Sequence, residues 1–271
     1  MRIRLLTSHL STENLAQGSL ADMLAKKIPM LTGNTVTEES PDIVHIFGCW
    51  DYQILKATKE LYHRRIPYIY SPLEGLMPWN MKSWKSHPNF CAQQREAVKR
   101  AVSIQVCGQM EKEVMEQLGW NNRIIVIPNP ATTSLMTEVE SLRLFMDFYQ
   151  DAVLHYDQTI HDDIQRQLNA FSELEESARE LLKQILYAHY LYQRRQIPKS
   201  FLDELAHCMI QSDYNEDQMA EVLSKLHLLQ FVARLETVLS WESDLTEGFM
   251  PIIQKNDRET DRIKNCITNY H

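Results

Sequence analysis

The chain has 271 residues, of which 44% are hydrophobic, and a net charge of −8, values that fit a globular protein of one large or two small domains. No apolar run approaches the ~20 residues of a membrane-spanning helix, and the short apolar start lacks a signal cleavage site, so we expect a cytoplasmic protein. The five cysteines are scattered without a C-x-x-C pair, which argues against a disulfide framework or a zinc ribbon and fits a reducing compartment.

Short β-branched runs alternate with amphipathic stretches over the first 130 residues. The runs with the composition of strands are residues 3–8, 43–48, 66–71, 103–107 and 123–128. Apolar residues at helical spacing occupy intervals between them. Because strands separated by helices are joined by right-handed crossovers, the pattern predicts an α/β domain with a Rossmann-like parallel sheet.

The use of glycine and proline changes near residue 130. Six of the seven glycines lie at or before Gly119, and after Pro130 only three such residues follow, namely Pro198, Gly248 and Pro251. We therefore expect a sheet domain over residues 1–132 and an all-helical module over residues 133–271.

The charges of the two parts differ. Residues 1–130 carry 15 Lys and Arg against 12 Asp and Glu, whereas residues 131–271 carry 13 against 24. An acidic balance excludes nucleic acid as a partner of the second part, because phosphate backbones require clustered positive charge. The mildly basic first part fits a phosphorylated ligand.

Helical periodicity governs the second part of the chain. From Leu142 to Phe171, apolar residues recur at steps of three and four, which predicts one long helix. The segment 172–175, S-E-L-E, has the pattern of a capping box and predicts the start of a second helix. A third helix is expected after Pro198 and a fourth from Asp213 through Leu235, the four packing as a bundle.

Residues that follow the expected strands are the candidates for a binding site, since ligands of open α/β sheets bind beyond the carboxyl ends of the strands. Glycine there lets the backbone approach a ligand, and tryptophan stacks on a sugar ring. These candidates are His9, His45, Gly48, Trp50, Ser71, Gly75 and Asn129. Glu74 is the candidate acid/base group, the alternative being an ordinary surface carboxylate.

Four segments, in order, resemble the family-4 retaining glycosyltransferases of GT-B fold. Residues 41–50 resemble the segment P-D-[IV]-[VI]-H-x-H-G-x-W, and residues 67–79 resemble P-[YF]-[VI]-x-S-P-H-G-x-x-x-P-W. Residues 103–119 resemble a strand followed by E-x-x-x-L-x-x-x-G, and residues 124–129 the closing I-x-V-I-P-N-G. The resemblance covers about residues 1–133, which implies the N-terminal, acceptor-side domain of that family.

Departures from the family pattern affect its reacting centre. The glycine-rich loop after the first strand is replaced by S-H-L-S-T-E at residues 8–13. Leu73 stands where the family has the histidine of S-P-H-G and Glu74 where it has the glycine, while Phe47 and Pro130 replace a second histidine and the last glycine. A leucine neither donates a hydrogen bond nor accepts a proton.

The lobe that would bind the nucleotide sugar has no counterpart after residue 132. The resemblance therefore implies a glycosyltransferase-like protein of surface polysaccharide or glycoconjugate assembly that is incomplete or inactive alone. The alternative is a non-catalytic module that binds a carbohydrate or nucleotide while its helical part recruits a protein.

Further partners and ligands follow from smaller features. His155 and His161 lie on different faces of the long expected helix, so we expect no metal site there, and no motif indicates a cofactor. The stretch 79–85, with two tryptophans and two lysines, suits peripheral contact with a membrane surface, although a structural role for both tryptophans is the simpler interpretation.

Overall fold

The computed structural model describes residues 1–7, 19–32, 35–37, 40–82, 87–130, 136–243, 245, 252 and 254–268. The chain forms two compact units, Met1–Gln158 and Thr159–His271, which we call the sheet unit and the helical unit and describe separately. The division falls within the long helix α6, Glu138–Asn169.

The first half of α6 belongs to the sheet unit, so this division lies later than residue 132, where the loss of glycine and proline suggested a boundary. The apolar face of this half, including Leu142, Phe145 and Tyr149, is buried in the same core as the first strands. Helical periodicity identified the helix itself correctly but carries no information about which core buries its apolar face.

Six parallel strands form the sheet, in the order β2-β1-β3-β4-β5-β6. The strands are β1 (Arg2–Leu6), β2 (Thr35–Val36), β3 (Ile43–Phe47), β4 (Tyr68–Ser71), β5 (Ser103–Val106) and β6 (Ile124–Val126). All five runs expected to form strands do so, which confirms the α/β class with a parallel sheet. The two-residue strand β2 escaped prediction because it is too short to show alternation.

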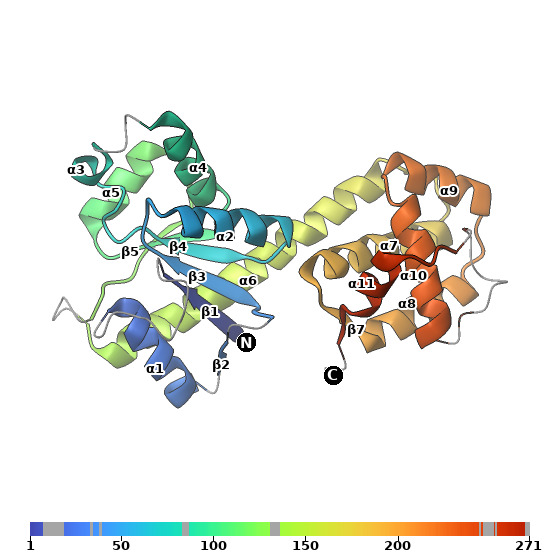
Figure 1. The fold of residues 1–271 in the computed structure, drawn as a ribbon, viewed down its shortest axis with the longest axis horizontal. Helices are drawn as coiled ribbons and strands as arrows, with labels where there is room; N and C mark the ends of the chain where they lie inside the picture. Colours follow the sequence, from blue (N-terminus) through green and yellow to red (C-terminus); the bar gives the residue numbers. More distant parts are fainter. Residues whose placement is uncertain are drawn as a thin grey trace. The chain divides into compact units, whose positions relative to one another are not determined.

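Helices cover both faces of the sheet (Figure 1). Alternate side chains of β1, such as Ile3 and Leu5, pack with α1 (Leu20–Thr32) and with the first half of α6. Side chains of opposite orientation, such as Val44, Ile46 and Tyr70, pack with the helices of the other face. These helices are α2 (Tyr52–His63), α4 (Pro88–Lys99) and α5 (Gln109–Leu118).

The connection from β2 to β3 is too short to contain a helix. Only six residues separate Val36 from Ile43, and the main-chain amides of Thr37 and Asp42 bond back to carbonyl groups of β1. The face of β1 next to α2 therefore lacks the covering that a crossover helix would give it.

The helical unit contains the second half of α6 and five further helices among the described residues. They are α7 (Glu176–Arg194), α8 (Lys199–Gln211), α9 (Glu216–Lys225), α10 (Leu229–Glu242) and α11 (Arg258–Lys264). A pair of two-residue parallel strands, β7 (Ile197–Pro198) and β8 (Ile267–Thr268), corrects the expectation of an all-helical module.

Two expected helix limits are wrong. The S-E-L-E segment does not cap α7, which begins at Glu176 after a turn whose Phe171 and Leu174 are buried. The expected fourth helix is divided into α9 and α10 at His227, whose φ is 58°. In both places local tertiary packing or a left-handed residue overrides the periodic pattern.

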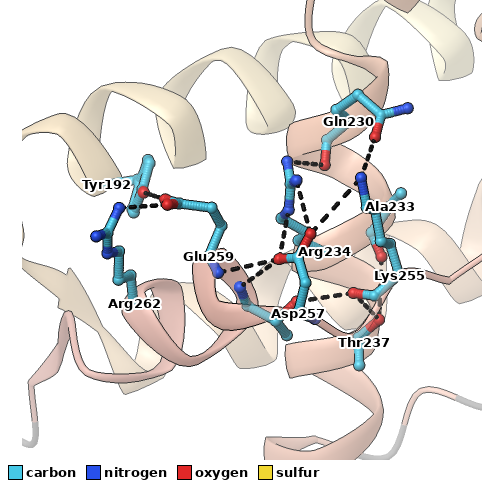
Figure 2. A network of polar contacts seen from close by, with 10 residues as sticks. Tyr192, Gln230, Ala233, Arg234, Thr237, Lys255, Asp257, Glu259 and Arg262 are labelled. Atoms are coloured by element: carbon cyan, nitrogen blue, oxygen red, sulfur yellow. Dashed lines mark hydrogen bonds and ion pairs between the residues drawn. The ribbon is translucent and has the colours of Figure 1, made fainter.

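The short helix α11 is fastened to α10 by a network of polar contacts (Figure 2). Arg234 donates from Nε and Nη2 to the two carboxylate oxygens of Asp257, at 2.9 and 2.8 Å. The same carboxylate caps α11 in a reciprocal capping box with Thr260. These hydrogen bonds hold the pKa of Asp257 well below its usual range.

No helix among the described residues has both the length and the apolar character to cross a bilayer.

Candidate ligand-binding edge of the parallel sheet

The strand order places a topological switch point between β1 and β3. The chain leaves β1 toward β2 on one side of the sheet and leaves β3 toward β4 on the other. In open α/β sheets this divergence opens a crevice beyond the carboxyl ends of the two strands. We call the residues after β3, β4, β5 and β6 the carboxyl edge.

A chain of hydrogen bonds lies beneath this edge, on the face covered by α6. Its members are Tyr149 of α6, His45 of β3, Ser71 of β4 and Gln105 of β5, and it ends on the carbonyl of Ile127. The Tyr149 hydroxyl is 2.7 Å from His45 Nδ1, Ser71 Oγ is 2.6 Å from His45 Nε2, and Gln105 Nε2 is 2.7 Å from the Ile127 oxygen. We call this set the buried polar chain.

The direction of every bond in the buried polar chain follows from its last member. A carbonyl oxygen only accepts, so Gln105 donates from Nε2 to Ile127 and accepts through Oε1 from the Ser71 hydroxyl. The Ser71 hydroxyl has one proton, which it donates to Gln105, so His45 must donate to Ser71 Oγ from Nε2. His45 Nδ1 is left as an acceptor, and Tyr149 donates to it.

The buried polar chain therefore requires a neutral imidazole. His45 is 0% exposed, and burial lowers its pKa to about 3. Both ring nitrogens are occupied by protein groups, and Ser71 is equally buried. His45 and Ser71, expected to contact a ligand, instead connect β3, β4, β5 and α6, because their side chains point into the α6 face and not beyond the strand ends.

Trp50 is held from the opposite face. Its main-chain amide donates to Gln94 Oε1 at 2.9 Å, and Gln94 in turn donates to the Tyr70 hydroxyl at 2.9 Å. The indole Nε1 donates to the carbonyl of Gly75 at 2.6 Å. Trp50 thus ties the end of β3 to the loop after β4, which leaves its indole donor engaged within the protein.

The two expected glycines have different reasons to be glycine. Gly48 has a φ of 93°, where side chains are strained, and a Cβ there would meet nothing within 4 Å. A Cβ on Gly75 would lie 2.7 Å from the Cβ of Cys49, so Gly75 is required for close packing. Of these two glycines, Gly48 is the one that offers open backbone to a ligand.

Left-handed backbone is concentrated at the ends of β3 and β4. Besides Gly48, the residues Trp50, Leu73 and Glu74 have φ values of 60°, 50° and 63°. Such conformations cost about 1–2 kcal/mol in a residue other than glycine and persist where the surrounding structure enforces them, often at functional sites. Glu74 and Leu73 are also exposed, so the strained loop after β4 faces solvent.

A buried carboxylate fixes this loop from below. Glu111, in the first turn of α5, accepts hydrogen bonds from the amide of Glu74 at 2.7 Å and from that of Cys107 at 3.0 Å. Burial raises the pKa of Glu111, and the two amides act in the opposite direction. Glu111 thereby joins the loop after β4 to the loop after β5.

The cysteines near the edge are unsuited to nucleophilic chemistry. Burial raises the pKa of both the Cys49 and the Cys107 thiol, which disfavours the reactive thiolate. Cys49 Sγ donates to the carbonyl of Pro72 at 3.6 Å, and a main-chain hydrogen bond from Asn129 reaches Cys107.

Two expected site residues remain. Asn129 is half-buried after β6, and His9 lies outside the described residues.

Sequence reasoning missed the groups that support the edge. Tyr149 and Gln94 lie on helices, Gln105 lies inside β5 and Glu111 in the first turn of α5, and their role at the edge becomes visible only through their contacts. The sequence offers one signal, since Gln105 is a polar residue between the apolar residues Ile104 and Val106 of a fully buried strand.

No group of three or more metal-ligating side chains is found among the described residues. His161 of α6 contacts the Tyr187 hydroxyl through Nδ1 at 3.0 Å.

Comparison with protein-family models, curated proteins and solved structures found no match for the chain.

Proposed function

We propose that the sheet unit binds a carbohydrate at its carboxyl edge, as the acceptor-side domain of a glycosyltransferase-like protein, and that the chain does not transfer sugar by itself. One observation carries the proposal: the exposed loop at Glu74 has left-handed backbone, and the buried carboxylate of Glu111 holds it through the main-chain amide of Glu74. Backbone strain of this kind is a mark of preorganised sites.

The resemblance to the family-4 glycosyltransferases gains support from backbone geometry. Glu74 occupies the position at which that family has glycine, and its φ of 63° lies in the region that favours glycine. The parallel sheet, with its switch point between β1 and β3, fits a Rossmann-like domain of this type. Surface polysaccharide or glycoconjugate assembly is the process we propose on this basis.

Two features favour binding over catalysis. The imidazole of His45 is buried and neutral with both nitrogens bonded, and Leu73 stands at the position of the histidine in the family's S-P-H-G segment. Among the described residues of the helical unit, the only strands are the two-residue pair β7 and β8, so that part offers no second sheet for a donor nucleotide.

The exposed groups of the loop after β4 suit a sugar. The Glu74 carboxylate accepts hydrogen bonds from sugar hydroxyls, and Trp79, 58% exposed in α3 (Pro78–Met81), offers an aromatic face. Asn80 donates from Nδ2 to the carbonyl of Glu74 at 2.8 Å, which folds α3 back onto the loop. We further propose that the acidic helical unit recruits a protein partner and that Trp79 and Lys82 favour peripheral contact with a membrane.

Titration calorimetry with a panel of oligosaccharides and nucleotide sugars tests the proposal. We expect saturable heat with a member of the panel and a loss of affinity of about tenfold in Glu74→Gln, since one hydrogen bond to a charged group contributes about 1.5–3 kcal/mol. Trp79→Ala should also weaken binding, by up to about tenfold, because the aromatic contact with the sugar is lost. Glu113→Gln, an exposed carboxylate of α5, is the matched control and should bind as the wild type does.

Two outcomes would contradict the proposal. Absence of heat from every sugar would remove the binding function, and equal affinity in all three variants would place any site away from the edge. Release of nucleotide from a nucleotide sugar by the purified chain would contradict the non-catalytic part.

A further inference from the structure

A hollow lies between β1 and α2, away from the carboxyl edge. Its volume is about 490 Å³, within the range of small-molecule sites. The polar side chains that line it are those of Arg4, Tyr52, Gln53, Lys56, Glu60 and Arg64. We call this hollow the α2 groove.

The α2 groove exists because of the short β2–β3 connection. A crossover helix from β2 to β3 would lie over β1, but the six residues between these strands leave no room for one. Arg4 and Leu6 of β1 consequently line the groove rather than packing beneath a helix.

Arg4 is a charged residue in the middle of β1, an internal strand of a parallel sheet. β1 lies between β2 and β3, where parallel sheets are normally apolar on both faces, and its neighbours Ile3 and Leu5 are 0% exposed on the α6 side. A half-buried guanidinium at the centre of such a strand indicates a surface adapted to bind negative charge.

One face of α2 completes the groove. Tyr52, Lys56, Glu60 and Arg64 follow one another at intervals of four, so they form a single stripe along the helix. Glu60 is the only carboxylate among the described residues that line the groove; its Oε1 lies 3.7 Å from Arg64 Nη1, and its side chain is 62% exposed. Among the described residues that line the groove, three side chains are cationic, those of Arg4, Lys56 and Arg64.

We propose that the α2 groove binds a nucleoside polyphosphate, with its phosphates on Arg4, Lys56 and Arg64 and its base on the ring of Tyr52. Tyr52 is 67% exposed at the start of the stripe, and Arg64 follows about 18 Å farther along the helix axis at 1.5 Å per residue. Such a span fits an extended ligand with an aromatic end and a charged end. Guanidinium groups match phosphate oxygens in geometry as well as in charge.

The test is titration of the full chain with ATP, UTP and inorganic triphosphate, without divalent cations. We expect saturable binding of a nucleotide to the wild type, about tenfold weaker in Lys56→Gln and in Arg64→Gln, because a charge-assisted hydrogen bond contributes about 1.5–3 kcal/mol. Lys59→Gln, an exposed lysine of α2 that does not line the groove, should bind within twofold of the wild type, about the limit of measurement.

A further variant separates the base from the phosphates. Tyr52→Ala should weaken nucleotide binding and leave inorganic triphosphate unaffected. Lys56 and Tyr52 are exposed, so their substitution leaves the fold intact even if Arg64→Gln, at the end of α2, does not.

Three results would overturn the proposal. They are no saturable binding of any nucleotide, an equal loss in Lys59→Gln, and wild-type affinity for inorganic triphosphate that equals the affinity for nucleotides. The groove and the carboxyl edge share no variants, so a sugar that binds at the edge leaves this result unaffected, and the reverse also holds.

Discussion

Removal of one hydroxyl group tests the buried polar chain. In Tyr149→Phe the ring is kept, but His45 Nδ1 loses its donor inside a core that water does not reach. An unsatisfied buried acceptor costs about 1–3 kcal/mol, and we expect the free energy of unfolding of the sheet unit to fall by this amount. Urea unfolding followed by tryptophan fluorescence suits the measurement, because four of the five tryptophans lie in the sheet unit.

A control and a second variant make the result decisive. Tyr62→Phe removes a hydroxyl from a tyrosine that is 43% exposed and should change stability by less than about 0.5 kcal/mol. Ser71→Ala interrupts the buried polar chain at its centre, and the double variant with Tyr149→Phe should lose less than the sum of the single losses, by about 0.5–3 kcal/mol. Equal effects of Tyr149→Phe and Tyr62→Phe would refute the reasoning.

Measuring the protonation state of His45 tests the buried polar chain directly. Its pKa is lowered to about 3 from 6.5, so the unfolded chain binds the extra proton between these values and stability falls as the pH is lowered through this window. The loss amounts to at most about 5 kcal/mol at 1.36 kcal/mol per unit. Nitrogen-15 NMR should show a neutral ring with its proton on Nε2 at pH 5; a charged ring, or a proton on Nδ1, would refute the assignment.

Three further predictions concern other parts of the chain. Glu236 is 0% exposed, and burial raises its pKa to about 8, so the folded helical unit holds the extra proton and loses stability, by at most about 5 kcal/mol, as the pH rises from 4.5 through 8. Glu236→Gln should abolish this slope in thermal unfolding followed at Trp241, and an unchanged slope would refute it. Glu74→Gly should raise the free energy of unfolding by about 1 kcal/mol through relief of left-handed strain, whereas a loss in urea unfolding would show that no strain is stored there. Asp257→Asn keeps a capping side chain but weakens the pair with Arg234, so hydrogen exchange in α11 should increase moderately, and more in Asp257→Ala, which loses both; equal exchange in the two variants would contradict the separate roles.

Five strands of the sheet unit and the long helix α6 follow from local patterns in this sequence, and so they were predictable. Most strands of the sheet unit are short, predominantly apolar and β-branched or aromatic runs, and the long stripe from Leu142 to Phe171 has one period throughout. The division of α6 between two cores was not predictable, since a stripe records that a face is buried and not what it is buried against.

Some features of the candidate site were predictable from the sequence and others were not. That Gly48 and Glu74 follow strands could be deduced from position alone, and the structure places both at the carboxyl edge. The roles of His45 and Ser71 could not, because they depend on Tyr149, 104 residues away, and on which face of the strand each side chain occupies. The α2 groove could not be predicted from the sequence either, because it depends on the absence of a helix between β2 and β3.

A crystal structure of the full chain soaked with the best-binding sugar of the panel tests the central claim most directly. The account predicts density for the sugar beyond the carboxyl ends of β3 and β4, in contact with the Glu74 carboxylate and next to the open backbone of Gly48. Density located elsewhere, or an edge covered by protein with Glu74 inaccessible, would contradict it.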